Sequence, residues 1–167
     1  MEHAIPALVI AAVIVVGGVI LADATRGSLE TVDQSWRDIE AISEERLGTA
    51  LTVVSTQVTD GGATVTAVLR NEGRTAITEP SHMDLIMNYD GTDDERHVVW
   101  LPYAENSPPG DNHWTVDSIS GDYRNPGMLD TGEEMTIQIR LNPATKDGPN
   151  RWLVLATETG VAYSIYF

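Results

Sequence analysis

A continuous apolar run near the N-terminus constrains the possible fold of this chain more than any other part of its sequence. From Ala4 to Ala22 (AIPALVIAAVIVVGGVILA) no side chain carries a charge or a hydrogen-bonding group. As an α-helix the run would be roughly 28 Å long, close to the thickness of a bilayer core. It could be a secretory signal peptide, although the basic residues and the small-residue cleavage site of such a peptide are missing. A transmembrane anchor, or a helix buried among other helices, fits the run better.

The residues after this run predict that the helix continues with one apolar side. Charged residues alternate there with apolar ones, which recur at spacings of three to five and form a stripe along the helix. Pro6 lies in the first turn, where its missing N–H has no cost, and Gly48 is a plausible end of the helix. We therefore expect one helix from about residue 4 to 47, roughly 66 Å long. The residues of the stripe, expected to pack on the chain's own head or on a neighbouring subunit, are Leu29, Val32, Trp36, Ile39, Ile42 and Leu47.

The two halves of this helix need different surroundings. The first half is apolar all round and has to be buried in lipid or in other helices. Small residues such as Gly17 and Gly18 allow helices to approach closely, although they could also be tolerated weak points in a membrane span. The residues expected to form an assembly core are Ile5, Leu8, Val9, Ile10, Val13, Ile14, Val16, Gly17, Gly18, Ile20 and Leu21.

From Thr49 onward the periodicity changes from helical to strand-like. Apolar and polar residues alternate on both sides of the Asp60-Gly61-Gly62 turn, which indicates a hairpin. Turn signals separate about seven short strands, whereas residues 103–128 read as a long irregular excursion. The predicted fold is α+β, with a helical part (1–48) followed by an antiparallel immunoglobulin-like β-sandwich head (49–167). Besides the hairpin strands, the strand candidates are Met83–Tyr89, His97–Leu101, Met135–Leu141, Arg151–Thr157 and Val161–Tyr166.

Charge and cysteine content exclude several classes of function. The formal net charge is −15, from 25 acidic and 10 basic residues, so binding to nucleic acid is not expected. The chain has no cysteine, which removes disulfides, thiolate metal sites and cysteine nucleophiles.

No motif predicts an enzyme, a cofactor site or a strong metal site. Asp130-Thr131-Gly132 matches the aspartic-protease triplet, but it occurs once, and a turn before a strand explains it better. The acidic stretch 90–95 has oxygen ligands without the spacing of an EF-hand, so a solvated turn is favoured over a weak Ca²⁺ site. The four histidines lack zinc-motif spacing; they are His3, His82, His97 and His113.

Two stretches of the head resemble archaellum proteins, a branch of the type IV pilin-like superfamily. Residues 64–77 (TVTAVLRNEGRTAI) resemble the strand-turn-strand T-V-x-V-x-N-x-G-x-T-x-L of these proteins. Residues 129–137 (LDTGEEMTI) resemble their L-x-P-G-E-x-x-T-I turn and strand. The order of a bare apolar helix, an acidic amphipathic continuation and a β-domain follows the same plan.

This resemblance implies a structural role outside the cell. We expect a subunit of an extracellular helical filament for swimming, assembled by packing of the N-terminal helices and inserted in the membrane before assembly. The resemblance also implies a secretion and assembly ATPase as a partner. One alternative is a single-span archaellum accessory or stator protein whose head binds the cell envelope. Others are an adhesive type IV pilin and, more remotely, a membrane-tethered ligand-binding sandwich or enzyme.

Overall fold

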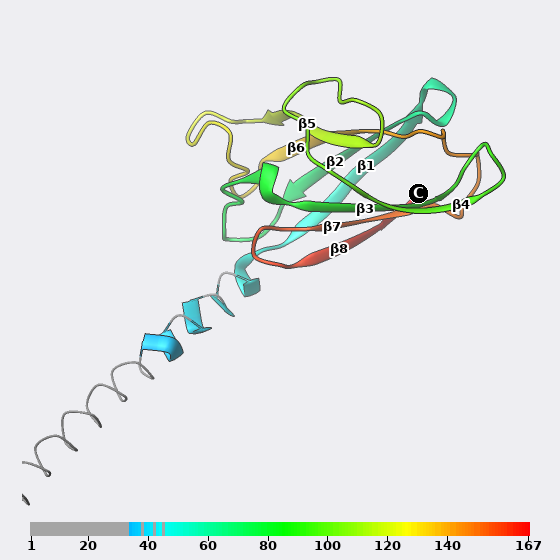
Figure 1. The fold of residues 1–167 in the computed structure, drawn as a ribbon. Coiled ribbons are helices and arrows are strands. Elements are labelled where there is room, and N and C mark those ends of the chain that lie inside the picture. Colours follow the sequence, from blue (N-terminus) through cyan, green and yellow to red (C-terminus); the bar gives the residue numbers. More distant parts are fainter. Residues whose placement is uncertain (1–33, 38, 42, 45) are drawn as a thin grey trace, which may run out of the picture. The chain divides into compact units, whose positions relative to one another are not determined.

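The computed structural model describes residues 34–167 apart from 38, 42 and 45 (Figure 1). The described residues between 34 and 48 are helical, and Glu44–Phe167 form a compact unit that holds every strand. The apolar part of the predicted helix, with its proposed assembly core, lies outside the described residues. Over the part of the chain that is described, no helix has the length and apolar character needed to cross a membrane.

Eight strands form the head, one more than the sequence patterns indicate. Their bounds are β1 Leu51–Thr59, β2 Thr64–Asn71, β3 Asp84–Asp90, β4 Arg96–Leu101, β5 His113–Ser120, β6 Glu134–Arg140, β7 Trp152–Ala156 and β8 Ala162–Tyr166, with short 3₁₀ turns η1 Asp60–Gly62 and η2 Pro80–His82. The predicted strands are confirmed, and η1 closes the predicted hairpin between β1 and β2. The expectation of a long loop or extended excursion over 103–128 missed a strand, because β5 lies within this span.

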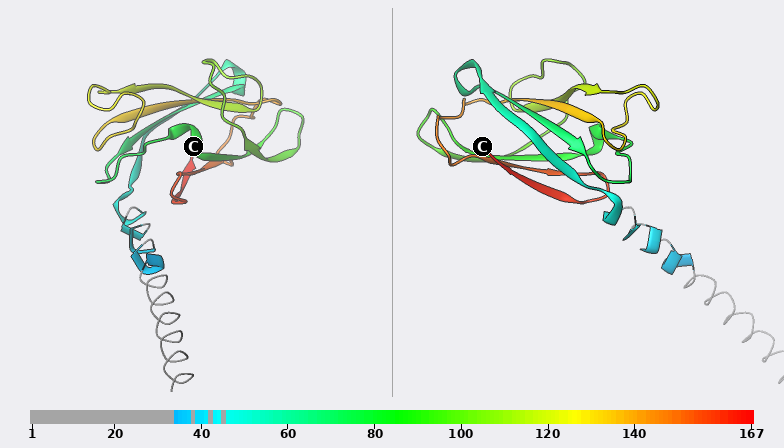
Figure 2. Two further views of the ribbon diagram at one scale, coloured as in Figure 1. Left: turned by 60° about the vertical axis from the view of Figure 1, so that its left-hand side comes forward. Right: turned by 180° about the vertical axis from the view of Figure 1, so that it is seen from behind.

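The strands form two antiparallel four-stranded sheets, which confirms the sandwich (Figures 1 and 2). Sheet I has the order β1-β2-β6-β5, and sheet II has the order β4-β3-β7-β8. Each sheet buries alternate residues of its central strands, as the period of two requires. In sheet I the buried set includes Val65, Ala67 and Leu69 of β2, which face Leu85 and Met87 among the buried residues of sheet II.

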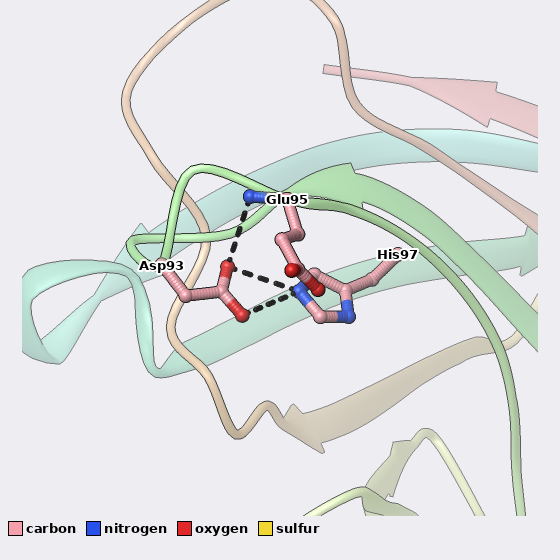
Figure 3. A group of neighbouring side chains, drawn as sticks. All are labelled: Asp93, Glu95 and His97. Atoms are coloured by element: carbon pink, nitrogen blue, oxygen red, sulfur yellow. Dashed lines mark hydrogen bonds and ion pairs between the residues drawn. The ribbon is translucent and has the colours of Figure 1, made fainter.

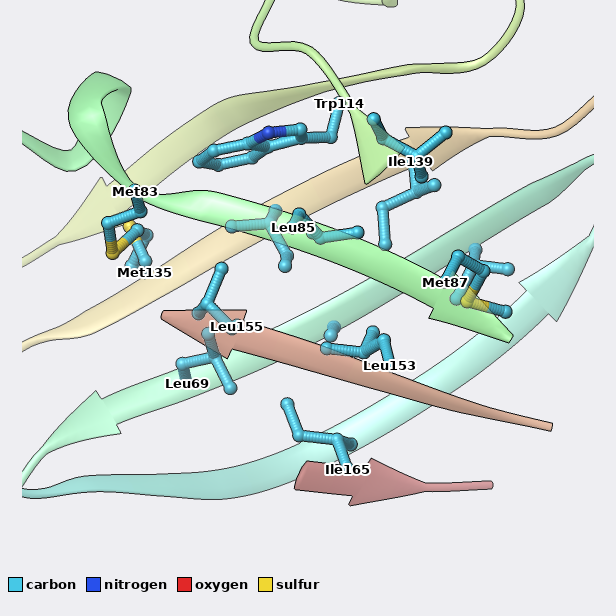
Figure 4. Close-up of a cluster of buried hydrophobic side chains, with 14 of the residues drawn as sticks. Leu69, Met83, Leu85, Met87, Trp114, Met135, Ile139, Leu153, Leu155 and Ile165 are labelled. Atoms are coloured by element: carbon cyan, nitrogen blue, oxygen red, sulfur yellow. The ribbon is translucent and has the colours of Figure 1, made fainter. Parts of the chain in front are cut away.

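Trp114 is the largest of the fully buried side chains in the core (Figure 4). Trp114 comes from β5, the strand that the sequence pattern does not indicate. Tyr103 packs edge-on against it, with ring centroids 5.0 Å apart, and forms an isolated parallel bridge to it. The segment after β4 therefore crosses to the free edge of β5, where Ala104 N–H donates to the Trp114 carbonyl at 2.8 Å.

The C-terminal residues are part of the sandwich. Ile165 is buried in the core, and the Phe167 ring lies 5.4 Å from the Arg151 guanidinium carbon. Arg151 Nε donates to the Phe167 carbonyl at 3.1 Å, and Phe167 N–H donates to the Arg151 carbonyl at 3.2 Å. The Phe167 side chain is partly buried and packs against the core.

Deleting Ser164–Phe167 should destabilise the head. The deletion removes most of β8 and the buried Ile165, whose loss alone corresponds to about 2–5 kcal/mol. We expect the melting temperature, followed by the circular dichroism of the strands, to fall by roughly 10 °C or more. The single change Ser164→Ala, at an exposed position of the same strand, should leave it nearly unchanged. An unaltered melting temperature after the deletion would show that the C-terminus contributes nothing to the sheet.

Candidate functional site

The two sequence stretches that resemble archaellum proteins meet at the buried side chain of Asn71. Its Nδ2 donates to the carbonyl of Thr75 and to that of Leu129, both at 2.9 Å. Its Oδ1 accepts the backbone N–H of Gly73, also at 2.9 Å. Asn71 is fully buried, so an amide that both donates twice and accepts satisfies three backbone groups without help from water.

The backbone of Asn71 extends this connection to the turn before β6. Asn71 N–H donates to the Glu133 carbonyl at 3.0 Å, and the Asn71 carbonyl accepts from Gly132 N–H at 2.7 Å. Gly132 has a φ of +86°, a conformation that glycine adopts without strain. The Asp130-Thr131-Gly132 triplet therefore takes part in this hydrogen-bond network through the backbone N–H of Gly132.

The same region receives the chain where it enters the sandwich. We call residues 46–50 the neck. The Gly48 carbonyl accepts from Arg74 N–H at 2.8 Å and from Thr75 N–H at 3.2 Å. The Ala50 carbonyl accepts from Glu72 N–H at 2.8 Å and from Gly73 N–H at 3.1 Å. The neck therefore bonds along the whole turn that follows β2.

Two glycines make this close contact possible. A Cβ at Gly48 would collide with the Thr75 hydroxyl, and a Cβ at Gly73 would collide with the Gly48 carbonyl oxygen. Gly48 is needed for this approach, and the helical residues end at Gly48, as the sequence predicted.

Sheet II also holds the neck. Tyr163 of β8 donates its hydroxyl to the Thr49 carbonyl at 3.0 Å, and Arg46 Nε donates to the Thr159 carbonyl at 2.7 Å. The neck is therefore bonded to both sheets of the sandwich. We call this set of contacts, centred on Asn71, the neck clamp.

The residues predicted to form the packing stripe are only partly described. Leu47 belongs to the same compact unit as the sandwich, yet its side chain is 81% exposed, so its expected packing on the chain's own head is wrong. Trp36 and Ile39 are exposed in the helical segment. Leu29, Val32 and Ile42 lie outside the described residues, and packing of the stripe on a neighbouring subunit stays a prediction.

The acidic stretch 90–95 comprises the last residue of β3 and the loop before β4, and its four carboxylates do not all converge on one point. Asp90 pairs with Arg96 at 2.9 Å, and Asp94 forms an ion pair with Lys146. In the described part of the chain, the one group with metal-ligand atoms within 4.8 Å of one another is Asp93, Glu95 and His97 (Figure 3). Asp93 and Glu95 are exposed. The Ca²⁺ site considered for all four acidic residues does not fit this arrangement.

His97 and its neighbours control the electrostatics of this loop. The pKa of Asp93 lies below its usual value, chiefly because His97 Nε2 is 3.0 Å from both carboxylate oxygens. Burial raises the pKa of Tyr89, and the negative charge of Asp93 adds to that rise. The Tyr89 ring stacks on the His97 ring with centroids 5.2 Å apart, which fixes the imidazole beside Asp93.

Replacing His97 with alanine should therefore raise the pKa of Asp93. NMR titration of the Asp93 side-chain carbons should show its midpoint moving up toward the ordinary value near 3.9. Because the folded-state pKa is depressed, the stabilisation by this carboxylate exists above its unfolded pKa and is lost as the pH falls through the folded one. The matched change His82→Ala, at a histidine paired with Glu79, should leave the Asp93 midpoint in place. An unmoved midpoint in His97→Ala would mean that His97 does not control this carboxylate.

The remaining motifs have structural partners. Asp130 accepts from Asn125 Nδ2 at 2.8 Å, and the Glu133 carboxylate accepts the Asp130 N–H at 2.9 Å. These contacts lie beside an open cleft of about 520 Å³. His113 Nδ1 is 2.8 Å from the Asp111 carbonyl, and His3 lies outside the described residues. The geometry of the triplet is thus that of a stabilised turn.

Comparison with known proteins supports an archaellum-type head. No protein-family model and no curated protein matches the sequence. Among solved structures the chain is similar to the archaellum periplasmic stator protein FlaG from Sulfolobus acidocaldarius, with 25% sequence identity and a TM-score of 0.51. This match covers 71% of the chain and 99% of FlaG.

Two further structures are similar to the chain. One is in the periplasmic stator complex of FlaF and FlaG from the same organism, with 24% identity, a TM-score of 0.49 and coverage of 70% of this chain and 87% of that one. The other is the archaeal flagellin FlaB1 from Methanocaldococcus jannaschii, with 17% identity, a TM-score of 0.48 and coverage of 71% and 88%. The likeness to FlaG confirms the resemblance to archaellum proteins that the sequence predicted.

Proposed function

We propose that this chain is an archaellum component of the stator type, held in the membrane by its N-terminal segment with the sandwich outside the cytoplasm. The head would bind a fixed layer of the cell envelope and resist the torque of the rotating parts. The similarity to a periplasmic stator protein over nearly all of that protein supports this role.

The neck clamp is the observation that carries this proposal. A stator has to transmit force between its membrane segment and its head without the junction yielding. On the sheet I side the neck makes backbone hydrogen bonds through the carbonyls of Gly48 and Ala50. On the sheet II side the Thr49 carbonyl accepts a hydrogen bond from the Tyr163 hydroxyl. A load passed through the neck is therefore shared between both sheets instead of being borne by a free linker.

In this proposal the chain is not an enzyme and needs no cofactor. Its acidic side chains have structural partners: Asp90 and Asp94 form ion pairs with basic side chains, and Asp130 stabilises a turn. The function is mechanical, so it depends on binding and stiffness and not on a reacting group.

A filament subunit is the second candidate, and one observation favours it. Trp36, Ile39 and Leu47 expose large apolar side chains on the helical residues before the sandwich. Neighbouring helices in a filament would cover such a stripe, whereas a membrane-anchored stator would leave it in water. The extended apolar run from Ala4 to Ala22 would then form the filament centre.

Deleting the gene in the organism that encodes the chain separates the two candidates. A stator role predicts cells that still carry filaments, seen by electron microscopy, but do not swim. It also places the chain in the membrane fraction, from which detergent should release a monomer or small oligomer. Loss of the filaments themselves, with the chain abundant in filaments sheared from wild-type cells, would overturn the stator role and establish the filament subunit.

A charge within the apolar run should remove the chain from its normal location. For Val13→Asp the cost at the centre of a buried helix is about 2.5–3.5 kcal/mol. We expect less chain in the membrane fraction or, for a filament subunit, few filaments. Thr25→Asp adds the same charge just outside the run and is expected to behave like the wild type. Equal membrane or filament yield from Val13→Asp and the wild type would contradict burial of this run.

A further inference from the structure

The loop between β5 and β6 is longer than the fold requires. These strands are antiparallel neighbours in sheet I, and a hairpin loop of about two to five residues commonly joins such a pair. Here residues 121–133 join them (yellow in Figure 1). Leu129, in the second part of the loop, belongs to the core, whereas residues 123–127 are all exposed. Long loops that do not serve the core commonly carry a function.

Hydrogen bonds hold the exposed part of this loop in one shape. The Asp122 carboxylate accepts from Gly127 N–H at 2.9 Å, and Met128 N–H donates to the Asn125 carbonyl at 3.0 Å. Asn125 Nδ2 donates to Asp130 at 2.8 Å and so connects the loop to the turn before β6. The loop is therefore organised before any ligand binds, which lowers the entropic cost of binding.

The loop and the turn before β6 form the open cleft of about 520 Å³. This volume lies within the roughly 300–1,000 Å³ of small-molecule sites. Gly121 leaves room beside a carboxylate, because a Cβ there would lie 3.9 Å from Glu133 Oε1, and its φ of +88° favours glycine. The side chains that line the cleft are Tyr123, Arg124, Asn125, Asp130, Thr131 and Glu133.

Several groups in the cleft still have the capacity to bind a ligand. Within the described part of the chain, the Arg124 guanidinium makes no hydrogen bond or ion pair. Asp130 and Glu133 each use one carboxylate oxygen, Oδ2 and Oε2 respectively, to accept a hydrogen bond from the loop. The second oxygen of each stays available. Tyr123 is 92% exposed, so the cleft combines donors, acceptors and an open aromatic ring.

The chemistry of the lining selects one class of ligand. No aliphatic side chain lines the cleft, so it does not suit an apolar molecule. Two carboxylates in the cleft and a net charge of −15 repel phosphates and other anions. A neutral molecule with many hydroxyl groups fits, because each hydroxyl both donates and accepts a hydrogen bond. The C–H groups on one face of a sugar ring also pack well on an aromatic ring.

We propose that the cleft between the β5–β6 loop and the turn before β6 binds a neutral saccharide. The sugar ring packs on Tyr123, and Arg124 and Asn125 donate hydrogen bonds to its oxygens. Asp130 Oδ1 and Glu133 Oε1 accept hydrogen bonds from its hydroxyl groups. Because the cleft is open, the bound sugar can be one unit of a longer glycan. The site rests on this loop alone and goes beyond the mechanical role, so it is compatible with a stator or a filament subunit.

Saturation-transfer NMR on the full chain in a sugar-free detergent tests this site. The probes are the methyl glycosides of glucose, mannose, galactose and N-acetylglucosamine, with methyl galacturonide as the anionic counterpart. We expect at least one neutral glycoside to bind with a dissociation constant on the order of 1 mM, because hydrogen bonds in an open cleft replace those to water. Methyl galacturonide should bind more weakly, since the two carboxylates repel it.

Substitutions assign the binding to the cleft. Tyr123→Ala and Arg124→Ala should each weaken the binding of the neutral glycoside at least about tenfold, while circular dichroism shows both variants folded. Tyr166→Ala removes another exposed tyrosine, on β8, and should bind like the wild type.

Four results would overturn the proposal. They are no saturation transfer to any neutral glycoside, tighter binding of methyl galacturonide, binding that Tyr123→Ala leaves unchanged, and equally strong binding of a serine- and threonine-rich peptide without sugars. The last would assign the cleft to a polypeptide. None of these results bears on the gene-deletion experiment, so failure of the saccharide site is distinct from failure of the stator role.

Discussion

Replacing Trp114 with alanine is expected to lower the free energy of unfolding of the head by about 3–5 kcal/mol. The side chain is fully buried between the sheets and is packed edge-on by Tyr103. Its removal leaves a cavity that strands bonded on both sides cannot close. Because a domain of this kind is stable by only about 5–15 kcal/mol, the variant should unfold at much lower urea concentration.

Two further variants separate cavity formation from other effects. Trp114 Nε1 has no hydrogen-bond partner among the described residues, so Trp114→Phe loses buried area but no hydrogen bond and should cost less. Tyr123→Ala removes an exposed aromatic side chain and should change the free energy of unfolding by less than about 0.5 kcal/mol. If Trp114→Ala unfolds at the same urea concentration as Tyr123→Ala, Trp114 does not anchor the core.

Asn71→Asp should be nearly as damaging, although it barely changes the size of the side chain. Aspartate cannot donate, so the carbonyls of Thr75 and Leu129 lose their partner and face a carboxylate oxygen. Each buried carbonyl left without a hydrogen-bond donor costs about 1–3 kcal/mol of stability, and a buried unpaired charge adds to that cost. We expect a loss of about 3–5 kcal/mol in the urea unfolding of the purified chain at neutral pH.

The effect of Asn71→Asp should depend on pH. At acid pH the aspartic acid is neutral and regains one O–H donor, so part of the lost stability should return relative to wild type at the same pH. Asn106→Asp makes the same chemical change in an exposed loop and should be nearly neutral at both pH values. Equal stability of these two variants at neutral pH would mean that the neck clamp does not depend on the Asn71 amide.

Strands with regular alternation could be predicted from the sequence. In β2, β3 and β6 every second residue is buried, and turn signals bound each strand. Local sequence is sufficient there because the pleat alone decides which side chains face the other sheet. The two-sheet sandwich followed from the number and spacing of these strands.

β5 could not be predicted because its burial does not alternate. Trp114 and Thr115 are neighbours and are both buried, and the register with β6 shifts between Val116 and Ser118. A bulge reverses the faces of the following residues, so a search for a period of two finds no strand. Only the pairing with β6, and the return of Tyr103 and Ala104 to its other edge, define β5.

The candidate site shows a similar limit. The sequence indicated a turn at Asn71-Glu72-Gly73 and another at Asp130-Thr131-Gly132, and it linked both stretches to one family. It could not show that the two turns meet, because Asn71 and Leu129 are far apart in sequence and bond only in the fold. The reason for Gly48 was also nonlocal, since its close neighbour is Thr75.

The lysine of the ion pair between Lys146 and Asp94 provides a site for attaching this protein to a surface. Lys146 is the only lysine in the sequence, and it lies beside the β3–β4 loop, at the end of the head away from the neck (Figure 1). Apart from the N-terminal amine, an amine-reactive linker would therefore attach the protein at a single known point. Heads immobilised in this way would all be tethered through the same side chain with their necks free, as single-molecule pulling through the neck requires.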